Sequence, residues 1–414
     1  MIRLISIFFL ILSLSGNLFS QETAEWRGPG RRGIYPGTGL LKSWPENGPK
    51  LILELNDIGN GYSSPVVYKN SIYVSGRKDT LDFISAYEMN GNKKWETAYG
   101  QAWNRTYSES RCTPTVENNR IYLVSGLGQV VCVDALSGKL LWTIDANTEF
   151  QGEPHRWGIA ESLAISEKAV FYVTGGEETS VIALDKTTGT LLWKTKSLGG
   201  TRAYASSVLI EKAGLKILMA QTANDLLAIN SENGEIIWNF NVMQYHTGES
   251  GKGGNTNTPL VYNDEIFVTS GYDHPAIMLS LASDGKSVKL KWTNSDFDNH
   301  MGGVVKIDDS IFGSNWLNNG KGNWVCVDWN TGKTNYETTW FNKGPIISAD
   351  GMLYCQEEKS GNLALVKPNP EKFELVSSFK IGKGEGPFWA HPTIYDGKLL
   401  VRHGEYLAIY DLKK

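Results

Sequence analysis

Short alternating runs of apolar and polar residues recur along the whole chain. Typical runs are Ile72–Gly76, Ile121–Gly126 and Ile266–Gly271, each following a shorter run that begins at a proline. Alternation with a period of two predicts half-buried β-strands, and the glycines and asparagines between the runs predict tight turns. With 44 glycines and 14 tryptophans, many turns and many aromatic residues also favour an all-β protein.

One longer pattern repeats through the chain. Its copies run from an alternating strand to an Asp or Asn, then to a glycine four residues on, and then to a second strand carrying tryptophan; they end at Trp95, Trp142, Trp193, Trp238 and Trp292, with a sixth copy, Val325–Tyr336. Successive tryptophans are 47, 51, 45 and 54 residues apart. A period of this length with four strands per unit predicts a β-propeller.

Counting units from residue 63 predicts eight blades, with seven as the alternative if one degenerate copy forms no blade. The last unit, 391–414, has only three strands, and residues 49–55 supply the missing outer strand. We therefore expect residues 49–414 to form one propeller closed by strand 49–55, preceded by a lead-in segment, 21–48. Closure would leave the sheets without free edges.

Residues 1–20 have the features of a secretory signal. Arg3 precedes an apolar stretch, Leu4–Leu14, and small polar residues follow up to Ser20, after which we expect cleavage. The apolar stretch is short for a membrane span, and no lipid-accepting cysteine follows it. We expect a periplasmic or secreted protein that is not a lipoprotein. The net charge of −4 and the absence of basic runs argue against a nucleic-acid partner.

The repeat resembles the tryptophan-docking repeat of the pyrroloquinoline-quinone (PQQ) family of propellers, which includes quinoprotein alcohol dehydrogenases and the outer-membrane assembly propeller. The segment Trp26–Gly33 is similar to the start of many secreted PQQ-like proteins. The resemblance implies that the repeated tryptophans pack between blades. Quinoprotein dehydrogenases typically carry an adjacent cysteine pair and calcium ligands, whereas Cys112, Cys132, Cys326 and Cys355 are far apart. PQQ and calcium are therefore disfavoured as cofactors, and no metal site is predicted.

Candidate chemistry lies in two classes of loop that should share the face over the central channel: the loops that precede each innermost strand, and the loops between the second and third strands of each blade. All six histidines fall in these classes by the predicted strands. The predicted catalytic candidates are His155, Arg202, Tyr204, His300 and His391, and the predicted ligand-binding candidates are Arg111, Arg156, Trp157, Glu161, Asn255, Asn257 and Trp389.

Arginine, histidine and tryptophan at one mouth predict a polar or anionic ligand, either a small molecule or an oligosaccharide. The main hypothesis is a binding propeller without quinone, whose partner could also be a protein. One alternative is a carbohydrate-active enzyme such as a uronate polysaccharide lyase, in which arginine neutralises the carboxylate and His or Tyr moves protons. A second alternative is a PQQ-dependent dehydrogenase.

Overall fold

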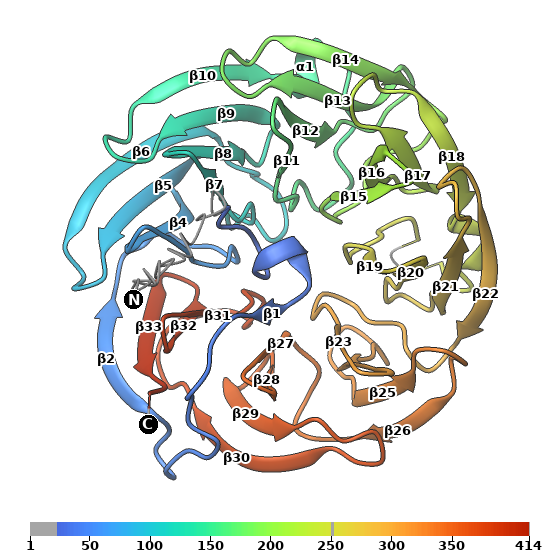
Figure 1. The fold of residues 1–414 in the computed structure, drawn as a ribbon. Coiled ribbons are helices and arrows are strands. Elements are labelled where there is room, and N and C mark those ends of the chain that lie inside the picture. Colours follow the sequence, from blue (N-terminus) through green and yellow to red (C-terminus); the bar gives the residue numbers. More distant parts are fainter. Residues whose placement is uncertain (1–22, 250–251, 414) are drawn as a thin grey trace, which may run out of the picture.

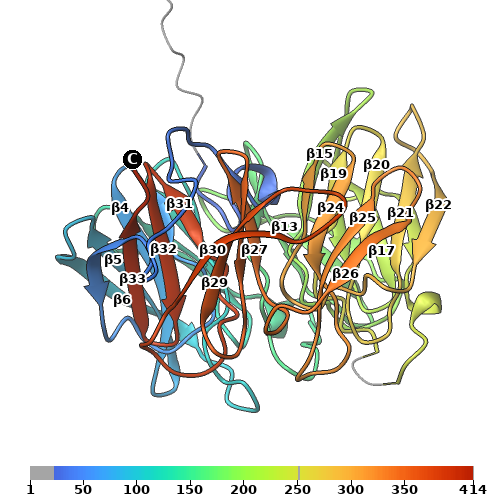
Figure 2. The same cartoon turned by 90° about the horizontal axis from the view of Figure 1, so that it is seen from below.

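The chain forms a ring of β-sheets in which each sheet is one blade (Figure 1). The computed structural model describes residues 23–249 and 252–413, so the predicted signal, 1–20, lies outside the described residues. The described part contains eight sheets, which confirms the eight-bladed propeller. In the view turned by 90°, the strands run between the two faces of the ring (Figure 2).

The first four blades follow one another in the sequence and have four antiparallel strands each. Blade 1 contains β3 (Val66–Tyr68), β4 (Ser71–Lys78), β5 (Leu81–Glu88) and β6 (Lys93–Gln101). Blade 2 contains β7 (Thr115–Glu117), β8 (Arg120–Val124), β9 (Gln129–Asp134) and β10 (Leu140–Asp145). Blade 3 contains β11 (Ala164–Ile165), β12 (Ala169–Val173), β13 (Thr179–Asp185) and β14 (Leu191–Lys196). Blade 4 contains β15 (Val208–Lys212), β16 (Leu215–Gln221), β17 (Asp225–Asn230) and β18 (Ile236–Asn241).

The remaining blades complete the ring. Blade 5 contains β19 (Leu260–Tyr262), β20 (Glu265–Val268), β21 (Ala276–Leu281) and β22 (Val288–Asn294). Blade 6 contains β23 (Val305–Ile307), β24 (Ser310–Ser314), β25 (Trp324–Asp328) and β26 (Thr334–Thr338). Blade 7 contains β27 (Ile346–Ala349), β28 (Met352–Gln356), β29 (Asn362–Lys367) and β30 (Glu374–Lys380). Blade 8 contains β31 (Thr393–Tyr395), β32 (Lys398–His403), β33 (Tyr406–Asp411) and, from the N-terminal side, β2 (Lys50–Leu55).

Strand β2 closes the ring as the outer strand of blade 8. It pairs antiparallel with β33, with Lys50 opposite Asp411 and Leu55 opposite Leu407. Behind this pairing, Leu55 packs in one apolar cluster with Ile72 of blade 1 and Leu400 of blade 8. The two ends of the chain therefore stabilise the same blade, and no edge of β33 is left open to solvent.

The repeated tryptophans join neighbouring blades, as the resemblance implied. The Nε1–H of Trp142 donates to the carbonyl of Lys186 at 3.2 Å, and that of Trp193 donates to Ser231 at 3.1 Å. The rings of Trp142 and Trp193 also lie against the turn glycine of the next blade, Gly189 and Gly234. A Cβ on Gly189 would lie 2.8 Å from the Trp142 ring, and the φ of Gly189 is +76°. The glycine is needed for both the turn and the close approach of the ring.

The N-terminal segment (residues 23–48) crosses the central channel before the chain reaches β2. Its 3₁₀ turn η1 (Pro29–Arg31) lies near the centre of the ring in Figure 1, in blue. Strand β1 (Ile34–Tyr35) then pairs parallel with the innermost strand β27. The other helical pieces are α1 (Ala146–Glu149) and the 3₁₀ turn η2 (Met243–Tyr245), both in loops that precede an innermost strand.

Two buried arginines hold the N-terminal segment in the channel. Arg27 donates to the carbonyls of Val304 at 2.5 Å and of Ile346 at 3.0 Å, in blades 6 and 7. Arg31 donates to the carbonyls of Ser162 and Leu163, next to blade 3. Guanidinium groups suit this role because several rigid donors reach carbonyls from different blades at once. The segment therefore links blades on both sides of the channel.

Candidate functional site

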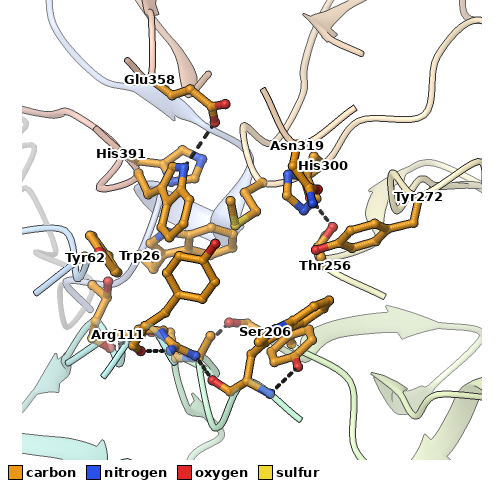
Figure 3. A pocket seen from close by; sticks show the side chains of 18 of the residues that line it. Trp26, Tyr62, Arg111, Ser206, Thr256, Tyr272, His300, Asn319, Glu358 and His391 are labelled. Atoms are coloured by element: carbon orange, nitrogen blue, oxygen red, sulfur yellow. Dashed lines mark hydrogen bonds between the residues drawn. The ribbon is translucent and has the colours of Figure 1, made fainter. Parts of the chain in front are cut away.

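A cavity of about 380 Å³ opens at the mouth of the channel (Figure 3). Loops from all parts of the ring supply its lining, because in a propeller the loops preceding the innermost strands gather on one face. Seven of the lining side chains are Trp or Tyr: Trp26, Tyr62, Tyr107, Trp157, Tyr204, Tyr272 and Trp389. A cavity of this size with aromatic walls and a few polar groups is typical of a small-molecule site.

One aromatic group comes from blades 3 to 5. The ring of Trp157 stacks on that of Tyr272, with centroids 5.7 Å apart and an interplanar angle of 20°. Tyr204 packs against Trp157 at 5.7 Å. The loops that carry these residues precede β11 and β15 and connect β20 to β21, so three blades combine to build one apolar surface.

A second aromatic group comes from the loops that precede blades 8, 1 and 2. Trp389 contacts Tyr62 at 4.8 Å and Tyr107 at 5.3 Å. The indole Nε1–H of Trp389 donates to Glu358 at 3.1 Å, and Glu358 is paired with Lys343 at 2.5 Å. The carboxylate thus fixes the Trp389 ring while its own charge is compensated by the lysine.

His155 and Tyr204 form a hydrogen-bonded pair at the edge of the cavity. His155 Nδ1 lies 2.5 Å from the Tyr204 hydroxyl, which also accepts the backbone N–H of Trp157 at 2.9 Å. The hydroxyl proton is therefore free to point to His155. Burial, with the neighbouring Arg156 charge, lowers the pKa of His155, and burial raises the pKa of Tyr204. Both pKa shifts keep the proton on Tyr204 in the resting pair, and the hydrogen bond from the phenol to a neutral imidazole provides the path along which a proton can be relayed.

Two further predicted histidines line the cavity. His300 is buried, and neither of its ring nitrogens has a hydrogen-bond partner among the described residues. The Nε2 of His391 lies 2.9 Å from the carbonyl of Gly302, to which it must donate, and its ring packs edge-on against Trp26 at 5.1 Å. Burial and the charge of Arg27 hold the pKa of His391 well below its usual range.

Arg111 lines the cavity, and its guanidinium hydrogen-bonds to the loops that form the cavity walls. Its two terminal nitrogens donate to the backbone carbonyls of Trp157 and Tyr107, one from each aromatic group. Burial lowers the pKa of Arg111, although the residue stays a cation at any physiological pH. Arg111 therefore stabilises the loops around the cavity in addition to supplying its positive charge.

Several predicted site residues lie elsewhere. Arg202 is completely buried behind the cavity, where it pairs with Glu161 at 2.7 Å and donates to the Tyr172 hydroxyl at 2.5 Å. The expectation that Arg202 faces the shared cavity is therefore wrong, because the guanidinium turns into the blade where a buried carboxylate compensates its charge. Arg156 is exposed and lies over the Trp157 ring at 4.4 Å.

The two asparagines that were predicted to bind a ligand hydrogen-bond instead to backbone carbonyls of neighbouring loops. Asn255 donates to the carbonyls of Thr222 at 2.8 Å and Ala223 at 3.3 Å, and Asn257 donates to those of Asn299 at 2.6 Å and His300 at 3.0 Å. Both are buried and do not line the cavity. The prediction that all six histidines lie in loops is wrong for His403, which is the last residue of strand β32.

Sequence reasoning missed several lining residues, among them Trp26, Tyr62, Tyr272 and Glu358. Tyr272 and Glu358 belong to the loops between second and third strands, a class already predicted to face the channel, so their position in the repeat could have found them. Trp26 could not be found in this way, because the N-terminal segment has no counterpart in the repeat.

Comparison with known proteins supports the fold and its family. The family model described as outer membrane protein assembly factor BamB matches residues 82–338. Among solved structures, BamB from Moraxella catarrhalis superposes with a TM-score of 0.63 at 12% identity, covering 88% of this chain and 99% of that one. A europium-containing methanol dehydrogenase superposes with a TM-score of 0.53 at 12% identity, covering 92% and 90% of the two chains. At such identities these likenesses show the fold alone.

Curated relatives are similar over shorter stretches. Quinoprotein alcohol dehydrogenase PedH of Pseudomonas putida is 24% identical over 44% of this chain and 31% of its own length. Tetrathionate hydrolase of Acidithiobacillus ferrooxidans is 22% identical over 59% of this chain and 52% of its own length. BamB of Yersinia pestis is 26% identical over 37% of this chain and 38% of its own length. The chain thus spans about a third to a half of the length of these relatives.

The cavity does not fit a quinone held with calcium. The four cysteines are free, buried and absent from the cavity lining, so no sulfur pair faces a planar cofactor. Glu358 is the one carboxylate among the lining residues, and Lys343 already compensates it. Calcium prefers six to eight oxygen ligands, with carboxylates among them. No group of three or more His, Cys, Asp or Glu side chains able to hold a metal occurs among the described residues.

Proposed function

Because the chain belongs to the family described as outer membrane protein assembly factor BamB, whose repeats are of the PQQ type, we propose that it is an extracytoplasmic binding propeller. Its ligand is a polar, ring-containing molecule, an oligosaccharide, bound at the mouth of the channel without a quinone. The observation that carries this proposal is the cavity of about 380 Å³ with seven Trp and Tyr side chains around it.

Aromatic rings suit sugars because the apolar face of a pyranose packs on a flat π-surface while its hydroxyls remain free for hydrogen bonds. The stacked pair Trp157–Tyr272 and the group around Trp389 are two such surfaces. The polar groups between them include hydroxyls, an amide and neutral imidazoles, which match the donor and acceptor pattern of a polyol. The two charged lining residues are already engaged, Glu358 with Lys343 and Arg111 with loop carbonyls.

The extracytoplasmic location rests on two observations. The names of the BamB relatives place those proteins at an outer membrane, and the first residues of this chain have the pattern of a secretory signal. Separately, none of the helices among residues 23–249 and 252–413 is long and apolar enough to cross a membrane. Fractionating cells that express the full chain, and sequencing the N-terminus of the mature protein, tests the location; mature protein beginning at residue 21 is expected.

Calorimetric titration with neutral and acidic oligosaccharides tests the ligand class. We expect saturable binding to at least one of them, weakened about tenfold or more by Trp157→Ala, because a buried aromatic contact of this size contributes on the order of 1.4 kcal/mol or more. Trp340→Ala is the matched control, since Trp340 packs on Phe373 at 6.0 Å and does not line the cavity. Equal affinities of the two variants, or no binding by any saccharide, contradict the proposal.

The His155–Tyr204 pair favours a second candidate function, a lyase acting on a uronate-containing polysaccharide. Arg111, whose terminal nitrogens already bind loop carbonyls, would compensate the substrate carboxylate through its charge alone. Tyr204 would take the α-proton as it passes its own to His155. The imidazolium would then return a proton through Tyr204 to the leaving sugar oxygen as the carbon–oxygen bond breaks and the carbon–carbon double bond forms. The product is an unsaturated uronate, whose ultraviolet absorbance is the assay. Activity that Tyr204→Phe abolishes would support the lyase; no absorbance change with any uronate polymer would exclude it.

A further inference from the structure

His300 is a buried polar side chain of the cavity whose two ring nitrogens both lack a hydrogen-bond partner among the described residues. It is 7% exposed, and both Nδ1 and Nε2 are buried and unpartnered among the described residues. The ring lines the cavity next to Tyr272, whose ring it meets edge-on at 4.5 Å (Figure 3). Buried polar groups in native proteins nearly always have a partner, so two unpaired nitrogens on one cavity wall point to a ligand.

The surrounding loops hold the backbone of His300 firmly in place. The Nδ2–H of Asn257 donates to the carbonyl of His300 at 3.0 Å, and the Thr256 hydroxyl donates to the same oxygen. Gly271 makes room for the residue, because a Cβ there would lie 2.9 Å from the His300 Cα. Three residues of two different loops thus fix the backbone of a residue whose side chain makes no hydrogen bond within residues 23–249 and 252–413.

The imidazole of His300 is neutral across the physiological range. Burial, with the nearby charge of Lys343, lowers its pKa to about 3. A neutral imidazole has one N–H donor and one bare nitrogen acceptor. It can therefore bind a hydroxyl at each nitrogen but cannot compensate a negative charge.

We infer that His300 recognises hydroxyl groups of the ring ligand and that the cavity selects an uncharged sugar over the corresponding uronate. This inference rests on the proposed function of the cavity as an oligosaccharide site. One ring nitrogen donates to a sugar oxygen and the other accepts a sugar O–H, so each buried nitrogen gains the partner that it lacks.

The charges nearby support an uncharged ligand at this wall. Lys343 is 2% exposed and bound to Glu358, so it is not available to a second carboxylate. Glu358 itself lines the cavity and is paired with Lys343, so the pair offers no net positive charge to a second carboxylate. Arg111 already donates from both terminal nitrogens to the carbonyls of Tyr107 and Trp157.

Two matched ligand pairs test the inference: β-1,4-linked mannotetraose with tetramannuronate, and cellotetraose with the β-1,4-linked tetraglucuronate. The members of a pair differ only in a CH₂OH or a carboxylate at each ring. Affinities are measured by calorimetry on the full mature chain, and the imidazole nitrogens of His300 are observed by long-range ¹H–¹⁵N NMR, with the signals assigned by their loss in His300→Phe. That variant keeps the aromatic contact with Tyr272 and removes both nitrogens.

We expect a neutral tetramer to bind at least tenfold more tightly than its uronate and to shift both His300 nitrogen signals. His300→Phe should weaken neutral binding about tenfold or more, the effect of losing two hydrogen bonds. His246→Phe is the matched control and should leave binding unchanged, because His246 is a buried histidine in a loop of the same face that does not line the cavity.

The contrary outcomes separate the inference from the proposed function. If a neutral tetramer binds without shifting the His300 signals, or a uronate binds as tightly as its neutral counterpart, the inference is overturned while the binding function stands. If none of the four tetramers binds, the proposed oligosaccharide function fails, and the inference fails with it.

Discussion

Neutral histidines at the cavity make the protein sensitive to acid. The unfolded chain binds a proton at each histidine below pH 6.5, the ordinary pKa, whereas burial keeps the folded pKa of His300 near 3 and that of His391 well below its usual value. Between these limits the unfolded state binds more protons than the folded state. Each such histidine therefore lowers the free energy of unfolding as the pH falls from 6.5.

His300→Phe isolates this effect for one side chain. Relative to the variant, the wild-type protein should lose about 1.4 kcal/mol of unfolding free energy for each pH unit below 6.5, until the pH approaches 3. Urea unfolding of both proteins at pH 7.5, 6.0, 5.0 and 4.5 measures the difference. Parallel pH profiles for the two proteins would mean that the imidazole is protonated or hydrated in the folded state.

The Arg202–Glu161 pair supports the fold and does not touch the cavity. Both side chains are 0% exposed. Arg202→Met should cost about 3–5 kcal/mol of unfolding free energy because it leaves Glu161 buried without compensation, and Arg202→Met with Glu161→Leu should regain most of this. Denaturant unfolding of the two variants provides the measurement. A double variant as unstable as the single one would mean that the uncompensated Glu161 carboxylate is not the cause of the loss.

At the scale of elements, the tryptophan and the glycine of successive repeats form one contact. The Trp193 ring is 9% exposed and lies against Gly234 of the next blade, where an added Cβ would be 2.6 Å from it. Leu192, one residue earlier on the same strand, points the other way and is 47% exposed. Strand β14 thus carries one residue that joins two blades and one that faces solvent.

This pair gives a stability test with an internal control. Trp193→Ala should lower the free energy of unfolding by about 3–5 kcal/mol, since it removes a large buried ring between two blades. Leu192→Ala should change it by less than about 0.5 kcal/mol, as is usual for exposed positions. Thermal or denaturant unfolding of both variants measures this. A cost below about 1 kcal/mol for Trp193→Ala would contradict its structural role.

The sequence predicted the repeating features and the closing strand at residues 49–55, but it missed the direction of several long side chains in the loops. The tryptophans and the turn glycines occupy the same position in each copy of the repeat. A pattern recognised in one copy can therefore be found in the others, and the blades can be counted. The direction of a long side chain within a loop is set by partners far away in the sequence. Arg202 turns inward because Glu161 is there, and Trp26 reaches the cavity because Arg27 fits carbonyls of blades 6 and 7. No local sequence pattern indicates the direction of Arg202 or the position of Trp26.

The whole molecule is held together by its N-terminal residues in two separate ways. Strand β2 completes blade 8 by pairing with β33, and it acts at the outer rim. The N-terminal segment crosses the channel, where Arg27 and Arg31 bind carbonyls on different sides of the ring and Trp26 lines the cavity. Closure of the ring therefore depends on β2, whereas completion of the cavity depends on the N-terminal segment (residues 23–48).

Two deletions separate these contributions. Deleting residues 23–48 keeps β2, so the ring should stay closed and melt only moderately lower, but saccharide binding should be lost with Trp26. Deleting residues 23–56 also removes β2 and exposes the edge of β33, so melting should fall by roughly 10 °C or more below the shorter deletion, with aggregation through the free edge. Calorimetric melting and light scattering measure both effects. If the two deletions melt alike, β2 does not carry the closure; if the shorter deletion binds as the intact chain does, Trp26 is no part of the site.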